Sequence, residues 1–206
     1  MNFIEYVEQK KKEVRKKNIK QVREEINLSW VKEKIINHVK AFDGLFTYED
    51  IYNGILTNDI IASKFCKDPS KQNISEKLAA EVLGLKKLPA SGKNCIRFSD
   101  TGDIVNTANP NHHSKSADFL FQGYYATQKY TNEEGGAQDN QRNDVIDFLK
   151  RGSLKHKVAA IVDGAYWEKY RPIIQEEFKD NPNVLITSIT EITEKNKEME
   201  TYGRHR

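Results

Sequence analysis

The chain has 206 residues, enough for one domain of ordinary size with a real hydrophobic core. Charged residues make up 31% of it, the mean hydropathy is −0.75, and the longest strongly apolar run is only Val158 to Val162. That run is far too short to span a bilayer, so we expect a soluble protein. The formal net charge of +3 is too small to identify a partner.

The basic residues are concentrated near the start of the chain, between Lys10 and Arg23. Such a stretch attracts polyphosphate, although a charged run is more often a solvated helix face. Cys66 and Cys95 have neither disulfide nor metal-ligand spacing, and the first residues lack the apolar core of a signal peptide. We therefore expect a cytoplasmic protein in a reducing compartment.

The first part of the chain is predicted to be helical. Residues 1–40 are rich in charge, free of Pro and Gly, and repeat apolar residues at helical intervals. Shorter helices are expected at 47–56, with Thr47 as the cap, at 58–65 and at 73–85. We expect residues 1–88 to form a mainly helical part that can contribute to dimerisation.

Strand patterns begin near residue 92. A hairpin is expected around the turn 100–103, and further strands at 119–121, 123–130, 157–162 and 183–192. Helices are expected at 139–151 and 166–180, and a loose polar tail at 193–206. The predicted fold is α/β (α+β): one domain over 1–206, with a helical N-terminal half around a central mixed β-sheet and an α/β core at 92–192.

Two charged residues, one before and one within it, mark the predicted strand pair at 119–130. Asp118 stands just before the first strand, and Lys129 lies on the second, where alternation puts Thr127 and Lys129 on one face. A carboxylate can hold Mg²⁺, and an ammonium group can orient the attacking water or stabilise the extra charge of a phosphoryl transition state. Taken singly, such an aspartate is usually a turn residue, and such a lysine usually faces solvent.

The stretch from Asp118 through Lys129, the loop "YTNEEGGAQDNQ" and the strand "VAAIVDGAYW" resembles the catalytic core of the PD-(D/E)XK nucleases, in the style of type II restriction endonucleases. The resemblance covers residues 115–165. It implies a mixed sheet flanked by helices, a homodimer, double-stranded DNA as substrate and Mg²⁺ as cofactor. It also implies that Asp118 and the Gln128 carbonyl hold the metal, with Lys129 beside the attacking water.

The chain departs from the family pattern where a second acid is usual, because Thr127 stands two residues before Lys129. Three alternatives for the missing acid remain open. The first needs no second acid: the metal is held by Asp118, the Gln128 carbonyl and waters with Thr127 in support, as in the mismatch-repair relatives of this fold. In the second, Asp144 supplies the acid from the following helix. In the third, Glu81 supplies it from the helix at 73–85. On a helical wheel Glu81 lies nearer the apolar edge of that helix than Glu76 does.

The start of the helix at 139–151 is expected to carry DNA contacts. Gln138, Gln141 and Arg142 project onto the same side as the apolar residues of this helix, and polar groups there are costly unless they bind something. We expect these three, with Lys115 and the pair Lys71 and Gln72, to contact the DNA backbone. The resulting prediction is a magnesium-dependent type II restriction endonuclease; the alternatives are a mismatch- or structure-specific repair nuclease and a DNA-binding pseudonuclease.

Overall fold

The computed structural model describes residues 2–69, 72–106, 113–132 and 136–195. The chain forms two compact units. One, the helical unit, is Glu5–Ile74; the other, the sheet unit, comprises Met1–Ile4 and Ser75–Arg206. The division falls after Ile74, earlier than residue 88, where the sequence predicts the helical part to end. None of the helices in the described ranges is long and apolar enough to cross a membrane.

The helical unit is built from four α-helices: α1 (Phe3–Glu24), α2 (Ser29–Ala41), α3 (Tyr48–Thr57) and α4 (Asp59–Phe65). Val22, Ile35 and Ile55 are fully buried in its core, as expected from the helical spacing of apolar residues. The predicted cap is confirmed: the Thr47 hydroxyl accepts from the Asp50 amide, and the Asp50 carboxylate accepts from the Thr47 amide. The stretch predicted as one helical region, 1–40, contains two helices separated by a turn at 25–28.

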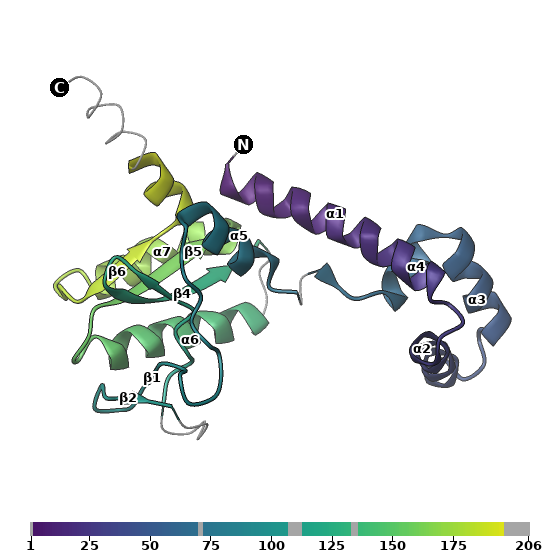
Figure 1. Ribbon diagram of the computed structural model, residues 1–206, viewed down its shortest axis with the longest axis horizontal. Helices are drawn as coiled ribbons and strands as arrows, with labels where there is room; N and C mark the ends of the chain where they lie inside the picture. Colours follow the sequence, from purple (N-terminus) through teal and green to yellow (C-terminus); the bar gives the residue numbers. More distant parts are fainter. Residues whose placement is uncertain (1, 70–71, 107–112, 133–135, 196–206) are drawn as a thin grey trace. The chain divides into compact units, whose positions relative to one another are not determined.

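The sheet unit contains α5 (Ile74–Leu83) and a small antiparallel pair, β1 (Arg97–Phe98) and β2 (Ile104–Val105). Its main sheet has the order β3-β4-β5-β6, formed by β3 (Phe119–Phe121), β4 (Tyr124–Tyr130), β5 (Val158–Asp163) and β6 (Val184–Thr187). β3 pairs antiparallel with β4, whereas β4, β5 and β6 are parallel. The predicted mixed α/β fold is therefore confirmed (Figure 1).

Two helices connect the parallel strands. α6 (Gly136–Gly152) joins β4 to β5, and α7 (Ala165–Glu177) joins β5 to β6. Successive crossovers that step in the same direction place their helices on the same face of a sheet, because such connections are right-handed. A hydrogen bond of 2.9 Å from Tyr166 on α7 to Asp139 on α6 agrees with this arrangement. Phe148 and Trp167 from these helices are fully buried in one core with Val158 and Ala160 of β5.

Two predicted boundaries at the end of the chain are wrong. The strand expected at 183–192 ends at Thr187, and residues 189–195 are helical, including the first three residues of the expected tail. The Asp163 carboxylate accepts from the Ile189 amide and so caps this helix. Ser188 and Glu191 add a capping box at the start of this helix, a local signal that the β-branched run of β6 obscures.

Gly164 lies where the residue that follows β4 packs against the start of α7. Its φ is +104°, and a methyl group in place of its hydrogen would lie 2.3 Å from the main-chain oxygen of Thr131. That oxygen is fixed, because it accepts from the Tyr166 amide at 3.2 Å. Gly164→Ala should therefore lower the free energy of unfolding by about 3 kcal/mol, through backbone strain and steric overlap together. Urea denaturation followed by circular dichroism would measure the change.

Gly84→Ala is the matched control, since Gly84 lies in the same unit with φ +62° and has open space around it. This substitution should cost only about 1 kcal/mol, the strain of a left-handed backbone alone. Equal losses in the two variants would contradict the close packing at Gly164.

Candidate functional site

The candidate site lies where β3 begins alongside β4. The two strands are joined by Gln122 and Gly123, whose φ values of +49° and +83° are those of a tight two-residue hairpin turn. This turn fixes the register, so that Phe119 pairs with Ala126 and the Asp118 amide donates to the Ala126 carbonyl at 2.8 Å. The Asp118 carbonyl accepts from the Leu88 amide at 2.7 Å, so the main chain of this aspartate is held on two sides.

The Asp118 carboxylate is held by three donors that meet at one of its oxygens. Oδ2 accepts from the Gln128 amide at 2.8 Å and from the Thr127 hydroxyl at 3.1 Å, and Lys129 Nζ lies 3.5 Å away. The Asp118 side chain is 15% exposed and that of Lys129 is 27% exposed. The expected convergence of Asp118 and Lys129 is therefore present, and solvent reaches both groups.

The main chain of Gln128 contributes a second oxygen at the same place. Its amide points to the side of β4 where β3 pairs, but β3 has already ended there, so Asp118 takes the bond instead. The carbonyl of a strand residue points to the same side as its amide, which places the Gln128 oxygen beside Asp118. The Gln128 side chain is buried on the opposite face, so only its main chain serves the site.

This donor set fits a magnesium ion with few protein ligands. Among the described residues no group donates to Asp118 Oδ1, which leaves one carboxylate oxygen and the Gln128 carbonyl for a hard cation. Mg²⁺ prefers oxygen ligands and usually retains several waters, so one carboxylate with a carbonyl is a sufficient protein contribution. The parts of the chain that the structure describes contain no group of three or more His, Cys, Asp or Glu suited to a metal.

Thr127 supports Asp118 without bringing a charge. Its side chain is 2% exposed and shares a face of β4 with Lys129, as alternation predicts. Its hydroxyl donates to the Asp118 oxygen that also faces Lys129. The position that carries a second acid in the family pattern thus holds a donor that orients the first one.

Among the described residues, neither alternative acid forms an ion pair with Lys129. Glu81 is exposed near the end of α5, whereas Glu76 is the more buried of the two and pairs with Lys87, so the expectation that Glu81 is the inward residue is wrong. The reason is that α5 ends at Leu83 and its last turn is open, with Val82 largely exposed. Asp144 faces Lys115, with 3.9 Å between the charged atoms.

The polar residues at the start of α6 contact their own neighbours in the sheet unit. Gln141 accepts from the Thr131 hydroxyl at 3.2 Å. Arg142 stacks on the Tyr170 ring of α7, 4.5 Å from its centroid, and pairs with Asp139 at 3.6 Å. The guanidinium of Arg142 is therefore engaged by α7 and by Asp139, and its contact with DNA stays a prediction.

The remaining expected DNA contacts are dispersed. Lys115 is exposed and Gln138 is half-buried. Gln72 belongs to the helical unit, where it donates to the Lys67 carbonyl at 3.5 Å, and Lys71 lies outside the described residues. The structure therefore brings together Asp118, Thr127, Gln128 and Lys129.

Comparisons with models of protein families, with curated proteins and with solved structures found no match to this chain. The argument for function therefore depends on the geometry of the site.

Asp163 is a buried acid in the sheet unit that no sequence motif indicates. The structure buries its carboxylate at the carboxyl end of β5, where burial raises its pKa from 3.8 to about 7. The Ile189 and Thr190 amides and the positive charge of Arg171 oppose this rise. No local signal reveals it, because the groups around Asp163 come from a helix more than twenty residues later.

The pKa of Asp163 predicts how stability depends on pH. The folded protein keeps this proton up to about pH 7, whereas the unfolded chain loses it near pH 4, so the carboxyl lowers stability as pH rises between these values. Relative to Asp163→Asn, the natural protein should lose up to about 1.4 kcal/mol per pH unit across this window. Urea titrations of both proteins from pH 4 to pH 8 would measure it. A difference that does not vary with pH would show that Asp163 is ionised throughout.

Proposed function

We propose that this protein is a magnesium-dependent endodeoxyribonuclease of the type II restriction kind. The observation that supports the proposal is the 3.5 Å separation of Lys129 Nζ and Asp118 Oδ2, in a solvent-reached position where the other carboxylate oxygen is unengaged among the described residues.

Each residue of the site has a role in phosphodiester hydrolysis. Asp118 Oδ1 and the Gln128 carbonyl would hold Mg²⁺, which when bound supplies a positive charge for the phosphate and acidifies a water. Lys129 holds the attacking water next to the phosphate and stabilises the extra negative charge as phosphorus gains a fifth oxygen. The attacking water gives up a proton to solvent, the bond to the leaving oxygen breaks, and that oxygen takes up a proton from solvent. Thr127 and the Gln128 amide keep the Asp118 carboxylate in one orientation.

Double-stranded DNA is the proposed substrate, and a homodimer acting in the cytoplasm is the proposed assembly. Both Cys66 and Cys95 are free, which fits a reducing compartment. Lys115, exposed three residues before Asp118, is the residue of the predicted DNA set that best fits contact with the phosphate backbone near the site.

A second candidate is a DNA-binding pseudonuclease. It is favoured by the three donors that already neutralise one Asp118 oxygen, and by the hydroxyl that stands where the second acid is usual. A repair nuclease is the third candidate, because the threonine resembles the mismatch-repair relatives of the fold. Plasmid incubated with Mg²⁺ separates the three: discrete fragments indicate restriction, random or mismatch-directed nicks indicate repair, and intact plasmid with retained binding indicates a pseudonuclease.

Lys129→Ala should reduce plasmid cleavage by at least about 100-fold, because it removes the positive charge beside the attacking water. DNA affinity should change little, since one phosphate contact among several is lost. Gel assays of cutting and of binding, each with and without EDTA, would measure both quantities. Lys157→Ala is the matched control: Lys157 is exposed just before β5 and its ammonium lies over the Tyr124 ring. If Lys129→Ala cut as fast as this control, the assigned roles would be wrong.

Thr127→Val keeps the shape of the side chain and removes the donor to Asp118. A hydrogen bond to a charged group contributes about 1.5–3 kcal/mol, so a carboxylate that turns away from its productive orientation should slow cutting by roughly 10-fold or more. The Mg²⁺ concentration for half-maximal cutting should rise as well. An unchanged rate with an unchanged Mg²⁺ requirement would mean that Thr127 is only a packing residue.

A further inference from the structure

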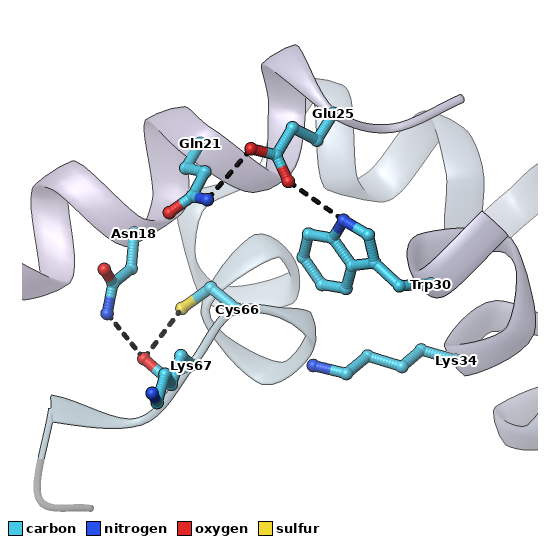
Figure 2. Close-up of a pocket in the computed structure, with 7 residues that line it drawn as sticks. All are labelled: Asn18, Gln21, Glu25, Trp30, Lys34, Cys66 and Lys67. Carbon is cyan, nitrogen blue, oxygen red and sulfur yellow. Dashed lines mark hydrogen bonds between the residues drawn. The ribbon is translucent and has the colours of Figure 1, made fainter. Parts of the chain in front are cut away.

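A cavity in the helical unit has a lining that the nuclease proposal does not use. Its volume is about 350 Å³, within the range of roughly 300–1,000 Å³ that holds small organic ligands. All of its lining residues belong to α1, α2 or the segments that follow α1 and α4 (Figure 2). It therefore lies entirely inside one compact unit.

Two amide side chains on α1 have fixed orientations. Asn18 Nδ2 donates to the Lys67 carbonyl at 2.7 Å, and Gln21 Nε2 donates to the Glu25 carboxylate at 2.9 Å. Both partners can only accept, so the amide nitrogens cannot exchange places with the oxygens. Asn18 Oδ1 and Gln21 Oε1 accept no hydrogen bond from the residues that the structure describes, so the α1 wall offers two acceptors.

The opposite side of the cavity is aromatic and cationic. Figure 2 shows Trp30 and Lys34 across from Asn18 and Gln21. Trp30 Nε1 donates to Glu25 at 2.9 Å, which fixes the indole as a flat apolar wall, and Lys34 Nζ lies 4.9 Å from its ring centroid. Glu25 is thereby engaged at both oxygens, by Trp30 at one and by Gln21 at the other.

The open charge of the cavity is positive. Lys67 is exposed at the rim and makes no ion pair with any described residue, and Lys34 uses one donor for the Phe65 carbonyl. Burial and the negative charge of Asp68 raise the pKa of the Cys66 thiol on the cavity wall, while Arg15 and Lys34 oppose the rise. Because Glu25 is engaged by Trp30 and Gln21, the exposed Lys67 favours an anionic group at the rim.

A flat wall, fixed acceptors and a cationic rim are together complementary to a nucleotide. Bases lie well against aromatic side chains, exocyclic amino groups donate to amide oxygens, and phosphates pair with lysines. We infer that this cavity binds a nucleotide whose base carries an exocyclic amino group, with its phosphate at Lys67. The same chemistry is offered by a free nucleotide and by an unpaired nucleotide within a strand. This site is separate from the cleavage chemistry at Asp118 and does not depend on it.

Tryptophan fluorescence can test the inference, because Trp30 is partly exposed and Trp167 is fully buried. Acrylamide, a neutral quencher, should therefore report on Trp30, and Trp30→Phe should remove most of the quenching. The probes are dAMP, dCMP, dTMP, inorganic phosphate, and single-stranded oligonucleotides of dA or dT. We expect dAMP or dCMP to protect Trp30 with a midpoint at least fivefold lower than that of dTMP, and phosphate alone not to protect it.

Lys67→Ala should raise the midpoint about fivefold or more, since the contacts of Lys67 in the cavity wall are made by its main chain. Lys64→Ala is the matched control, exposed on α4 but absent from the lining. Tighter protection by oligo-dA than by dAMP would identify the strand as the source, and equal protection would identify the free nucleotide. No protection by any nucleotide or oligonucleotide, equal protection by dTMP, or equal protection by phosphate alone would overturn the inference.

Asp118→Ala separates this inference from the nuclease proposal. The variant should lose cleavage and keep the protection of Trp30. If nucleotides protect Trp30 but the natural protein does not cut DNA, the nucleotide site stands and the nuclease proposal is rejected. If the natural protein cuts DNA but no nucleotide protects Trp30, the nuclease proposal stands and the nucleotide site is rejected.

Discussion

The candidate site depends on one hydrogen bond, from the Gln128 amide to the Asp118 carboxylate. β4 continues beyond the point at which β3 pairs with it, and an unpaired backbone amide there requires an acceptor. Asp118 supplies that acceptor with a side chain instead of a strand. The bond thereby satisfies the edge of the sheet and brings a carboxylate to the face that carries Thr127 and Lys129. It also leaves the second carboxylate oxygen without a donor among the described residues.

The parts of this arrangement that could be predicted from the sequence are those determined by neighbours along the chain. The Thr47 cap, the turn at Gln122 and Gly123, and the shared face of Thr127 and Lys129 each follow from a few consecutive residues. Two of the unexpected contacts concern partners distant in sequence. The Tyr170 ring that takes Arg142 and the Ile189 amide that Asp163 caps each lie more than twenty residues from the group they bind. Periodicity identifies the face of a helix, but it does not identify the group that meets that face.

The functional significance of Thr127 follows from where the charge of the site lies. A second carboxylate at position 127 would stand next to Asp118, and the two would repel each other unless a cation was bound. The threonine hydroxyl donates instead, so the Asp118 and Lys129 pair is neutral and ordered without metal. In the proposed nuclease, such a site would be preorganised at the cost of affinity for Mg²⁺, because one formal charge is a weaker attraction than two. Weak metal binding is compatible with catalysis, since the phosphate of the substrate brings further negative oxygens to the same ion.

The two candidate sites use positive charge in different ways. At the sheet, Lys129 is held by a carboxylate and is partly screened from solvent, which suits a group that must act at one atom. In the helical unit, Lys67 is exposed at a rim while Glu25 is engaged by Trp30 and Gln21, which suits capture of a phosphate whose exact position matters less. A lysine ammonium group on its flexible side chain can serve either purpose, action at one atom or capture of a phosphate. The residues around it decide which one applies. The formal net charge of +3 therefore says little about function, whereas the partners of individual lysines say much more.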